Sequence, residues 1–197
     1  SAFVKAVLDC DSDEAKRLYS DIKDVYPIVI TRHISRAKTW LRSKARGSER
    51  YGLVASSGAI RLKPFAINVK NSIDPRKWFL NGTNDIRSSY FLEDVATEFD
   101  IQGLELDWTC VAWDADLRHN GTSWQFKLFR GTRWQGIKDS EAQRYLKNAY
   151  RVLLTRARQG MVIFVPDGDH EDITRQPQFY DKTFHYLRSL GIVELKE

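Results

Sequence analysis

Two arginines close to one predicted strand are the residues of this sequence whose types and positions most clearly suggest a chemical role. The segment LLTRARQGMVIFVP, residues 153–166, is typical of a helix end, a glycine turn and a buried strand, with Arg156 and Arg158 in the last helical turn. The helix period places Arg156 on the apolar side, where an unpaired guanidinium is costly to bury. A salt bridge within the domain and a cleft cation that meets a phosphate both fit this pattern. Favourable placement of cations at a helix C-terminus is a third, simpler reading.

A second polar segment, EFDIQGLELDW, lies between two predicted strands. Gly103 permits an unusual backbone conformation or the close approach of a ligand. Gln102 and Glu105 supply an amide and a carboxylate, which suit ribose hydroxyls or a water molecule. Ligands of parallel α/β proteins bind where loops leave the carboxyl ends of the strands, so we expect this turn to border a ligand site.

Six carboxylates along two predicted strands raise a metal-dependent nuclease as an alternative: Glu98, Asp100, Glu105, Asp107, Asp114 and Asp116. Paired carboxylates can hold a magnesium ion. Restriction-type nucleases usually place a lysine two residues after a carboxylate on the second strand, and no such lysine follows Glu105 or Asp107. The pattern therefore disfavours this alternative.

Alternating strands and helices form the scaffold that must position these residues. The expected elements are two helices over 2–23, a strand over 26–32, a helix over 33–45 ended by Gly47, strands over 51–55, 95–99 and 109–114, a polar turn over 100–107, an antiparallel hairpin over 124–138, a helix over 138–158, a strand over 161–166, and a helix over 179–190 that is stopped by Gly191 and followed by a short strand. Such alternation is typical of a parallel sheet with crossover helices.

The segment over 138–158 has the strongest helical pattern of the chain. A capping box is predicted at Ser140 and Gln143. The inward stripe of this helix is predicted at Ala142, Tyr145, Leu146, Ala149 and Leu153.

Composition and charge narrow the class of protein. The chain has 197 residues, 42% hydrophobic and 29% charged, enough for one domain with a full core. No apolar run approaches the roughly 20 residues that a membrane helix requires, and two distant cysteines fit a reducing cytoplasm. The net charge of +5 is compatible with a polyanionic partner. Packing roles are expected for the aromatic residues Trp108, Trp113, Phe126, Phe129 and Trp134, with a strand-contacting pin as the alternative for the last three.

Two segments resemble motifs of the second RecA-like domain of superfamily 1 helicases. TEFDIQGLELD resembles motif V, and NAYRVLLTRARQGMVIFVP resembles motif VI. Longer stretches, among them YPIVITRHISRAKTWLRSKARGSERYGLVASSGAIRLKP, are similar to the bacterial schlafen group 3-like DNA/RNA helicase domain family over nearly the whole chain. The resemblance implies one C-terminal RecA-like domain over 1–197. It also implies an α/β, three-layer fold with a mostly parallel sheet flanked by helices, and a β-hairpin insertion.

The resemblance also implies roles for individual residues. Arg156 would reach the γ-phosphate of ATP, where an arginine stabilises developing phosphoryl charge by its position. Gly103, Glu105 and the adjacent Gln102 would approach the nucleotide. Arg158 is also expected to bind the nucleotide. Single-stranded DNA or RNA is the implied partner. The alternative is that the candidate contact residues simply lie in ordinary surface loops. These candidates are Ser56, Ser57, Arg61, Lys63, Arg87, Ser88 and Thr155.

The family pattern is incomplete in this chain, since no G-x-x-x-x-G-K-[ST] sequence occurs. We therefore expect ATP and Mg²⁺ to be held by a first RecA-like domain of the same protein, and the chain to be a C-terminal fragment of a cytoplasmic helicase or translocase without a membrane partner. Alone, the fragment should neither bind ATP tightly nor hydrolyse it. A non-catalytic nucleic-acid-binding module with a helicase fold remains the other reading.

Overall fold

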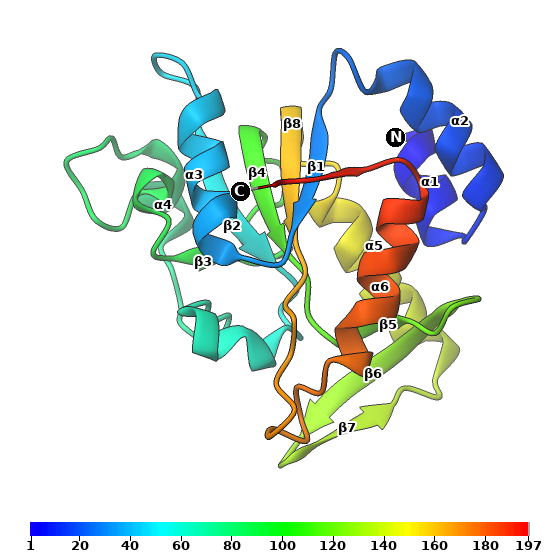
Figure 1. The fold of residues 1–197 in the computed structure, drawn as a ribbon. Helices are drawn as coiled ribbons and strands as arrows, with labels where there is room; N and C mark the ends of the chain where they lie inside the picture. Colours follow the sequence, from blue (N-terminus) through cyan, green and yellow to red (C-terminus); the bar gives the residue numbers. More distant parts are fainter. Residues whose placement is uncertain (197) are drawn as a thin grey trace.

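Six parallel strands form the central sheet of the computed structural model, which describes residues 1–196 (Figure 1). The strand order is β3-β2-β4-β8-β1-β9. The strands are β1 (Ile28–Thr31), β2 (Tyr51–Ala55), β3 (Val95–Ala96), β4 (Leu106–Ala112), β8 (Ala157–Phe164) and β9 (Val193–Glu194). Every pairing between them is parallel, as the alternation of strands and helices predicts.

Helices cover both faces of this sheet, which gives the three layers of a RecA-like fold. They are α1 (Ala2–Leu8), α2 (Ser12–Ile22), α3 (Ile34–Lys44), α4 (Pro75–Leu80), α5 (Ser140–Leu153) and α6 (Gln178–Ser189), with two 3₁₀ turns, η1 (Ile60–Phe65) and η2 (Ser89–Phe91). Figure 1 shows α3 on one side of the sheet and α1, α5 and α6 on the other. Within residues 1–196, no helix combines the length and the apolar character that crossing a membrane requires.

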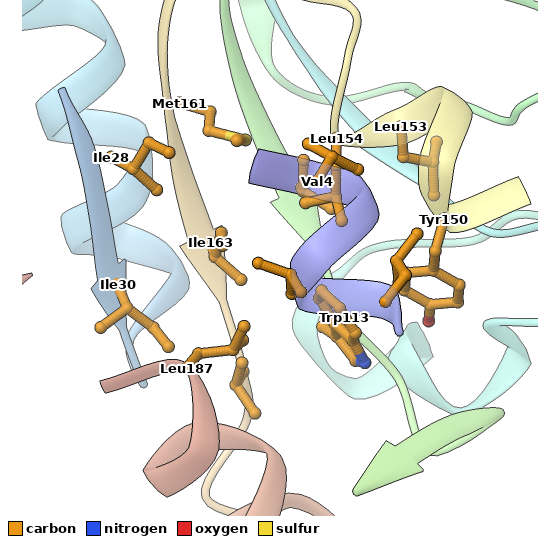
Figure 2. Packing of buried hydrophobic residues seen from close by; sticks show 14 of the residues in the cluster. Val4, Ile28, Ile30, Trp113, Tyr150, Leu153, Leu154, Met161, Ile163 and Leu187 are labelled. Atoms are coloured by element: carbon orange, nitrogen blue, oxygen red, sulfur yellow. The ribbon is translucent and has the colours of Figure 1, made fainter. Parts of the chain in front are cut away.

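Side chains of β8 alternate between the two layers, as expected for a strand buried on both faces. Met161 and Ile163 belong to the core cluster beneath α1, α5 and α6, whereas Val162 and Phe164 belong to the cluster beneath α3. Figure 2 shows Val4 of α1 among the side chains of the first of these clusters. The continuous apolar run of the strand is thus explained by burial on both sides.

A second, antiparallel sheet confirms the predicted hairpin and adds a strand to it. It contains β5 (Leu117–His119), β6 (Trp124–Arg130) and β7 (Arg133–Gly136) in that order. The indole Nε1 of Trp134 donates a hydrogen bond of 2.8 Å to the carbonyl of Thr174, which fixes the hairpin to the segment after β8. Trp108 and Trp113 are buried, as predicted.

The strand expected over 95–99 is shorter than predicted. Only Val95–Ala96 pairs with β2. The Asp100 carboxylate accepts hydrogen bonds of 2.8 Å from both the amide and the hydroxyl of Thr97, and this turns the chain away from the sheet. At the other side of the turn, β4 begins at Leu106, so Asp107 lies in a strand and not in the predicted turn.

The start of α5 differs from the predicted capping box. Asp139 is the N-cap, and its carboxylate accepts a hydrogen bond of 2.8 Å from the amide of Ala142. The Gln143 side chain donates instead to the carbonyl of Ile137. Ser140 is therefore the first helical residue and not the cap.

The inward stripe of α5 is also partly wrong. Tyr145 is 64% exposed, whereas Tyr150, which the stripe omitted, is fully buried. Ala149 and Leu153 are buried as predicted. The apolar face of α5 is thus rotated toward Tyr150, which lies four residues after Leu146 and three before Leu153.

The expected helix end and glycine turn are not found at 156–160. The helix ends at Leu153, and β8 begins at Ala157, so Arg156 precedes the strand and Arg158 lies within it. Gly160 is also inside β8, where a Cβ atom would lie 2.6 Å from the carbonyl oxygen of Pro27. The glycine is required by the close approach of the chain before β1.

Candidate nucleotide and nucleic-acid site

The two polar segments meet at the amino ends of β4 and β8. The amide of Leu106 donates a hydrogen bond of 3.0 Å to the carbonyl of Arg156. We call the group Gln102, Gly103, Glu105, Arg156 and Arg158 the amino-edge site. The expectation that the 100–107 turn lies at the carboxyl ends of the strands is wrong for residues 103–105, because the turn crosses the sheet and delivers the chain to the start of β4.

Arg156 is held by carbonyl oxygens and not by an acid. Its Nε donates to the carbonyl of Val152 at 3.3 Å, and one terminal nitrogen lies 3.5 Å from the carbonyl of Leu104. No carboxylate of residues 1–196 lies within salt-bridge distance of this half-buried side chain. Carbonyl oxygens orient a guanidinium without neutralising its charge, so donors remain for an anion.

The rest of the amino-edge site is open to solvent. Gly103 has a φ of +74°, in the left-handed region, and no heavy atom lies within 4 Å of the place of a Cβ there. Glu105 and Arg158 are each 65% exposed and stand 3.9 Å apart. An exposed pair at this distance contributes little stability, so both groups are available to a ligand at small cost.

Thr155 does not touch the guanidinium of Arg156. Its hydroxyl donates to the carbonyls of Arg151 and Val152, at 2.8 Å and 3.2 Å. The bond to Arg151 satisfies a carbonyl of the last turn of α5, whereas the Val152 carbonyl also accepts the Thr155 amide. The hydroxyl therefore helps to fix the chain that leads into Arg156.

The candidate nucleic-acid contacts Ser56 and Ser57 follow β2 at its carboxyl end. Ser56 is buried, and its Oγ accepts a hydrogen bond of 3.1 Å from the amide of Gly58. The amide and hydroxyl of Ser57 donate to the carboxylate of Glu98 at 2.8 Å and 2.7 Å. This turn therefore joins the loop that leads to the amino-edge site.

Arg61 and Lys63 have different surroundings in η1. The Arg61 guanidinium donates to Thr174 at 2.9 Å and pairs with Asp172 at 3.1 Å. Its amide also donates to the buried carboxylate of Asp114. Lys63, by contrast, is exposed. Arg61 anchors the segment after β8, whereas Lys63 is free to approach a phosphate.

Arg87 and Ser88 lie at the opposite end of β2. The buried Ser88 hydroxyl donates to the carbonyl of Asn81 at 2.7 Å and lies 3.4 Å from a terminal nitrogen of Arg50, which directly precedes β2. Arg87 is exposed and pairs with Asp85 at 2.8 Å. The five residues of β2 separate this pair from Ser56 by roughly 17 Å.

The six carboxylates that raised the nuclease alternative do not gather at one place. Glu105 and Asp107 stand at the start of β4, and Asp114 and Asp116 follow its end, roughly 20 Å away along the strand. Among residues 1–196, no group of three or more acidic, histidine or cysteine side chains is placed to hold a metal ion.

Two of these acids are buried side by side at the carboxyl end of β4. Asp116 Oδ1 accepts hydrogen bonds from the Tyr150 hydroxyl and the Leu117 amide, whereas Oδ2 accepts none of normal geometry among the described residues. The Ser56 hydroxyl also interacts with this carboxylate and partly offsets the rise in its pKa. Burial, followed by repulsion from Asp114, raises the pKa of Asp116 to about 7. Burial also raises the pKa of Asp114, although its carboxylate accepts a hydrogen bond from Tyr180.

A pocket of about 480 Å³ borders both Asp116 and α5, and we call it the α5 pocket. It extends from the Ser56–Gly58 turn along α5 to Val152, whose carbonyl holds Arg156. Its outer walls carry exposed aromatic side chains, Phe99 from the loop after β3 and Tyr145 from α5, which are 67% and 64% exposed.

Sequence reasoning missed this pocket and the contact between Asp116 and Tyr150. A usable signal was present, because Leu146, Tyr150 and Leu153 follow the helical period and place the tyrosine inward. Nothing local in the sequence indicates that Phe99 and Tyr145, 46 positions apart, border one hollow.

The comparison with known families agrees with these observations. The sequence model described as "Schlafen group 3, DNA/RNA helicase domain" matches residues 1–167. The chain belongs to this family. The resemblance to this family, which was predicted from long stretches of the sequence, is thereby confirmed, and membership of a DNA/RNA helicase domain family implies an interaction with nucleic acid. No curated protein matches the chain. The schlafen group 3 region includes the amino-edge site and the α5 pocket, whereas α6 and β9 lie beyond it.

Proposed function

We propose that this schlafen group 3 domain is the second motor domain of an ATP-driven helicase or translocase that acts on single-stranded DNA or RNA. In this proposal a P-loop domain of the same protein holds ATP and Mg²⁺. The present domain supplies Arg156 to the phosphates, and Gln102, Gly103 and Glu105 to the nucleotide. Arg158 extends the same positive edge.

One observation carries the proposal: the Arg156 guanidinium is fixed beside the 102–105 turn without an acidic partner among residues 1–196. A partly buried arginine gains from a nearby negative charge, and no carboxylate among residues 1–196 supplies one to Arg156. Phosphoryl transfer provides the missing negative charge, and it is greatest in the transition state. The fork of guanidinium donors suits phosphate oxygens better than an ammonium group does.

The test is ATP turnover by a polypeptide that joins this domain to its P-loop domain, measured with and without single-stranded DNA and RNA. We expect Arg156→Ala to reduce turnover about 10³-fold or more, with the melting temperature unchanged. Arg156→Lys should restore little, because it keeps the charge and loses the planar fork.

Arg133→Ala is the matched control, since it removes an exposed arginine from β7, in the hairpin and away from the amino-edge site. It should leave turnover unchanged. Undiminished ATP turnover in folded Arg156→Ala would reject the motor function and favour a non-catalytic binding module. The domain alone is expected to show weak or no ATP binding by calorimetry.

A further inference from the structure

We propose that the α5 pocket receives one unstacked base of the bound single strand and selects bases that carry an exocyclic amino group, through Asp116. This inference rests on the proposed nucleic-acid function and deepens it. A motor that holds only phosphates and stacked bases would be indifferent to sequence. The schlafen group 3 domain would instead prefer cytosine, adenine or guanine over thymine or uracil at one position.

The walls of the pocket suit the flat ring of a base. Phe99 and Tyr145 are the large exposed aromatic side chains of the pocket, and they come from two of the segments that border it. Leu146 and Val152 continue the apolar lining along α5. Proteins that read single strands commonly stack splayed bases on such aromatic rings. A volume of about 480 Å³ leaves room for a base and part of its sugar.

The polar end of the pocket would select which base binds. Asp116 is 1% exposed and its Oδ2 is unpartnered, whereas Oδ1 already accepts two hydrogen bonds. A buried acceptor without a donor is costly, so a ligand that brings a donor gains binding energy there. The amino groups of cytosine, adenine and guanine are such donors. Thymine and uracil offer one imide N–H between two carbonyls, which repel a carboxyl oxygen.

Gly58 governs the approach to this oxygen. A Cβ atom at position 58 would lie 3.0 Å from Asp116 Oδ2, so any side chain larger than hydrogen would close the route. Oδ2 is buried beside the Ser56–Gly58 turn, so the proposal requires this turn to move outward when a base binds. Lys127 also lines the pocket and can meet the phosphate of the inserted nucleotide.

The experiment measures fluorescence anisotropy of labelled oligothymidylates of roughly 12 nucleotides, bound to the polypeptide of the ATPase assay. The buffer is held at about pH 8, where Asp116 is mostly ionised and Oδ2 is an acceptor. The probes differ at one central position, which carries thymine, cytosine or no base. We expect cytosine to bind about fivefold more tightly than thymine, and the abasic probe to bind most weakly. Asp116→Asn and Gly58→Ala should each abolish the preference for cytosine.

Phe99→Ala should weaken every probe with a central base about 5- to 100-fold. Its matched control is Ile173→Ala, which removes a side chain that is 75% exposed but lies on the segment after β8. Melting temperatures verify that Gly58→Ala and Asp116→Asn remain folded, and the ratio of the two affinities is independent of overall stability.

The outcomes separate the two proposals. Equal affinity for thymine, cytosine and the abasic position, unchanged by Phe99→Ala, would overturn the base pocket and leave the motor function standing. A preference for cytosine that persists in both Asp116→Asn and Gly58→Ala would also overturn it. Failure of every probe to bind would contradict both proposals.

Discussion

Replacing Asp116 by asparagine tests whether this carboxyl group destabilises the fold when it ionises. The side chain is 1% exposed, it lies next to the buried Asp114, and one of its oxygens has no partner. Asparagine has nearly the same shape, and its amide oxygen can keep the hydrogen bonds from Tyr150 and Leu117. The substitution therefore removes the titration while it preserves most of the packing.

The sign and size of the effect follow from the pKa. Burial raises the pKa of Asp116 from its ordinary value of 3.8 to about 7, so the folded state binds the proton more tightly than the unfolded chain. The free energy of unfolding of the natural protein should then decrease as the pH rises from 4 to 7. Each unit of pKa difference is equivalent to about 1.4 kcal/mol, and the whole window gives about 4 kcal/mol. Above pH 7 the loss is constant.

Urea denaturation between pH 4.5 and pH 8 provides the measurement. Relative to the natural protein, Asp116→Asn should gain stability progressively across this range, with little difference at its acidic end. Asp24→Asn, at an exposed position after α2, should show the same pH dependence as the natural protein. Parallel pH curves for Asp116→Asn and the natural protein would refute the reasoning, because they would show that Asp116 ionises without cost.

Two further substitutions test the local structure. Asp139→Ala should destabilise the protein by about 1 kcal/mol through loss of the α5 N-cap, whereas Ser140→Ala should change the stability little. Thermal melts provide the measurement, and a larger loss in Ser140→Ala than in Asp139→Ala would favour a cap at Ser140. Gly160→Ala should cost about 2 kcal/mol or more, since its Cβ would lie 2.6 Å from the Pro27 carbonyl oxygen. Gly136→Ala has open space around it and serves as the control; equal melting temperatures for the two glycine variants would contradict the close approach.

The order of helices and strands could be predicted because the hydrophobic periods are strong. The apolar runs of β1, β4 and β8 are buried on both faces, and α3 keeps Ala37 and Leu41 inside as its period indicates. Boundaries were less predictable where a side chain competes with the backbone. Asp100 ends β3 early, and Asp139 is the cap in place of the predicted Ser140. Both effects come from local side-chain-to-backbone hydrogen bonds, which the hydrophobic period does not indicate.

The proximity of the two polar segments could be predicted, but their placement in the sheet could not. The two polar segments were expected together, and the bond between Leu106 and the Arg156 carbonyl brings them together. Their location at the amino ends of the strands was not foreseen, because the rule applied to the turn concerns loops that leave the carboxyl ends. The pocket depends on the rotation of α5, which exposes Tyr145 and buries Tyr150, and a one-position error in a helical stripe conceals it.

Helix α5 connects the α5 pocket to Arg156, the two places where we propose that a base and a phosphate bind. Its 14 residues form a rod of roughly 21 Å, whose middle borders the α5 pocket and whose last turn holds the guanidinium through the Val152 carbonyl. If the proposed base binds against this helix and shifts it, the Arg156 guanidinium should shift as well. By thermodynamic reciprocity, binding of phosphate at Arg156 would then change the affinity for the base by an equal factor. Coupling between the nucleotide and the nucleic acid would then act through α5 and would not require a change in the central sheet.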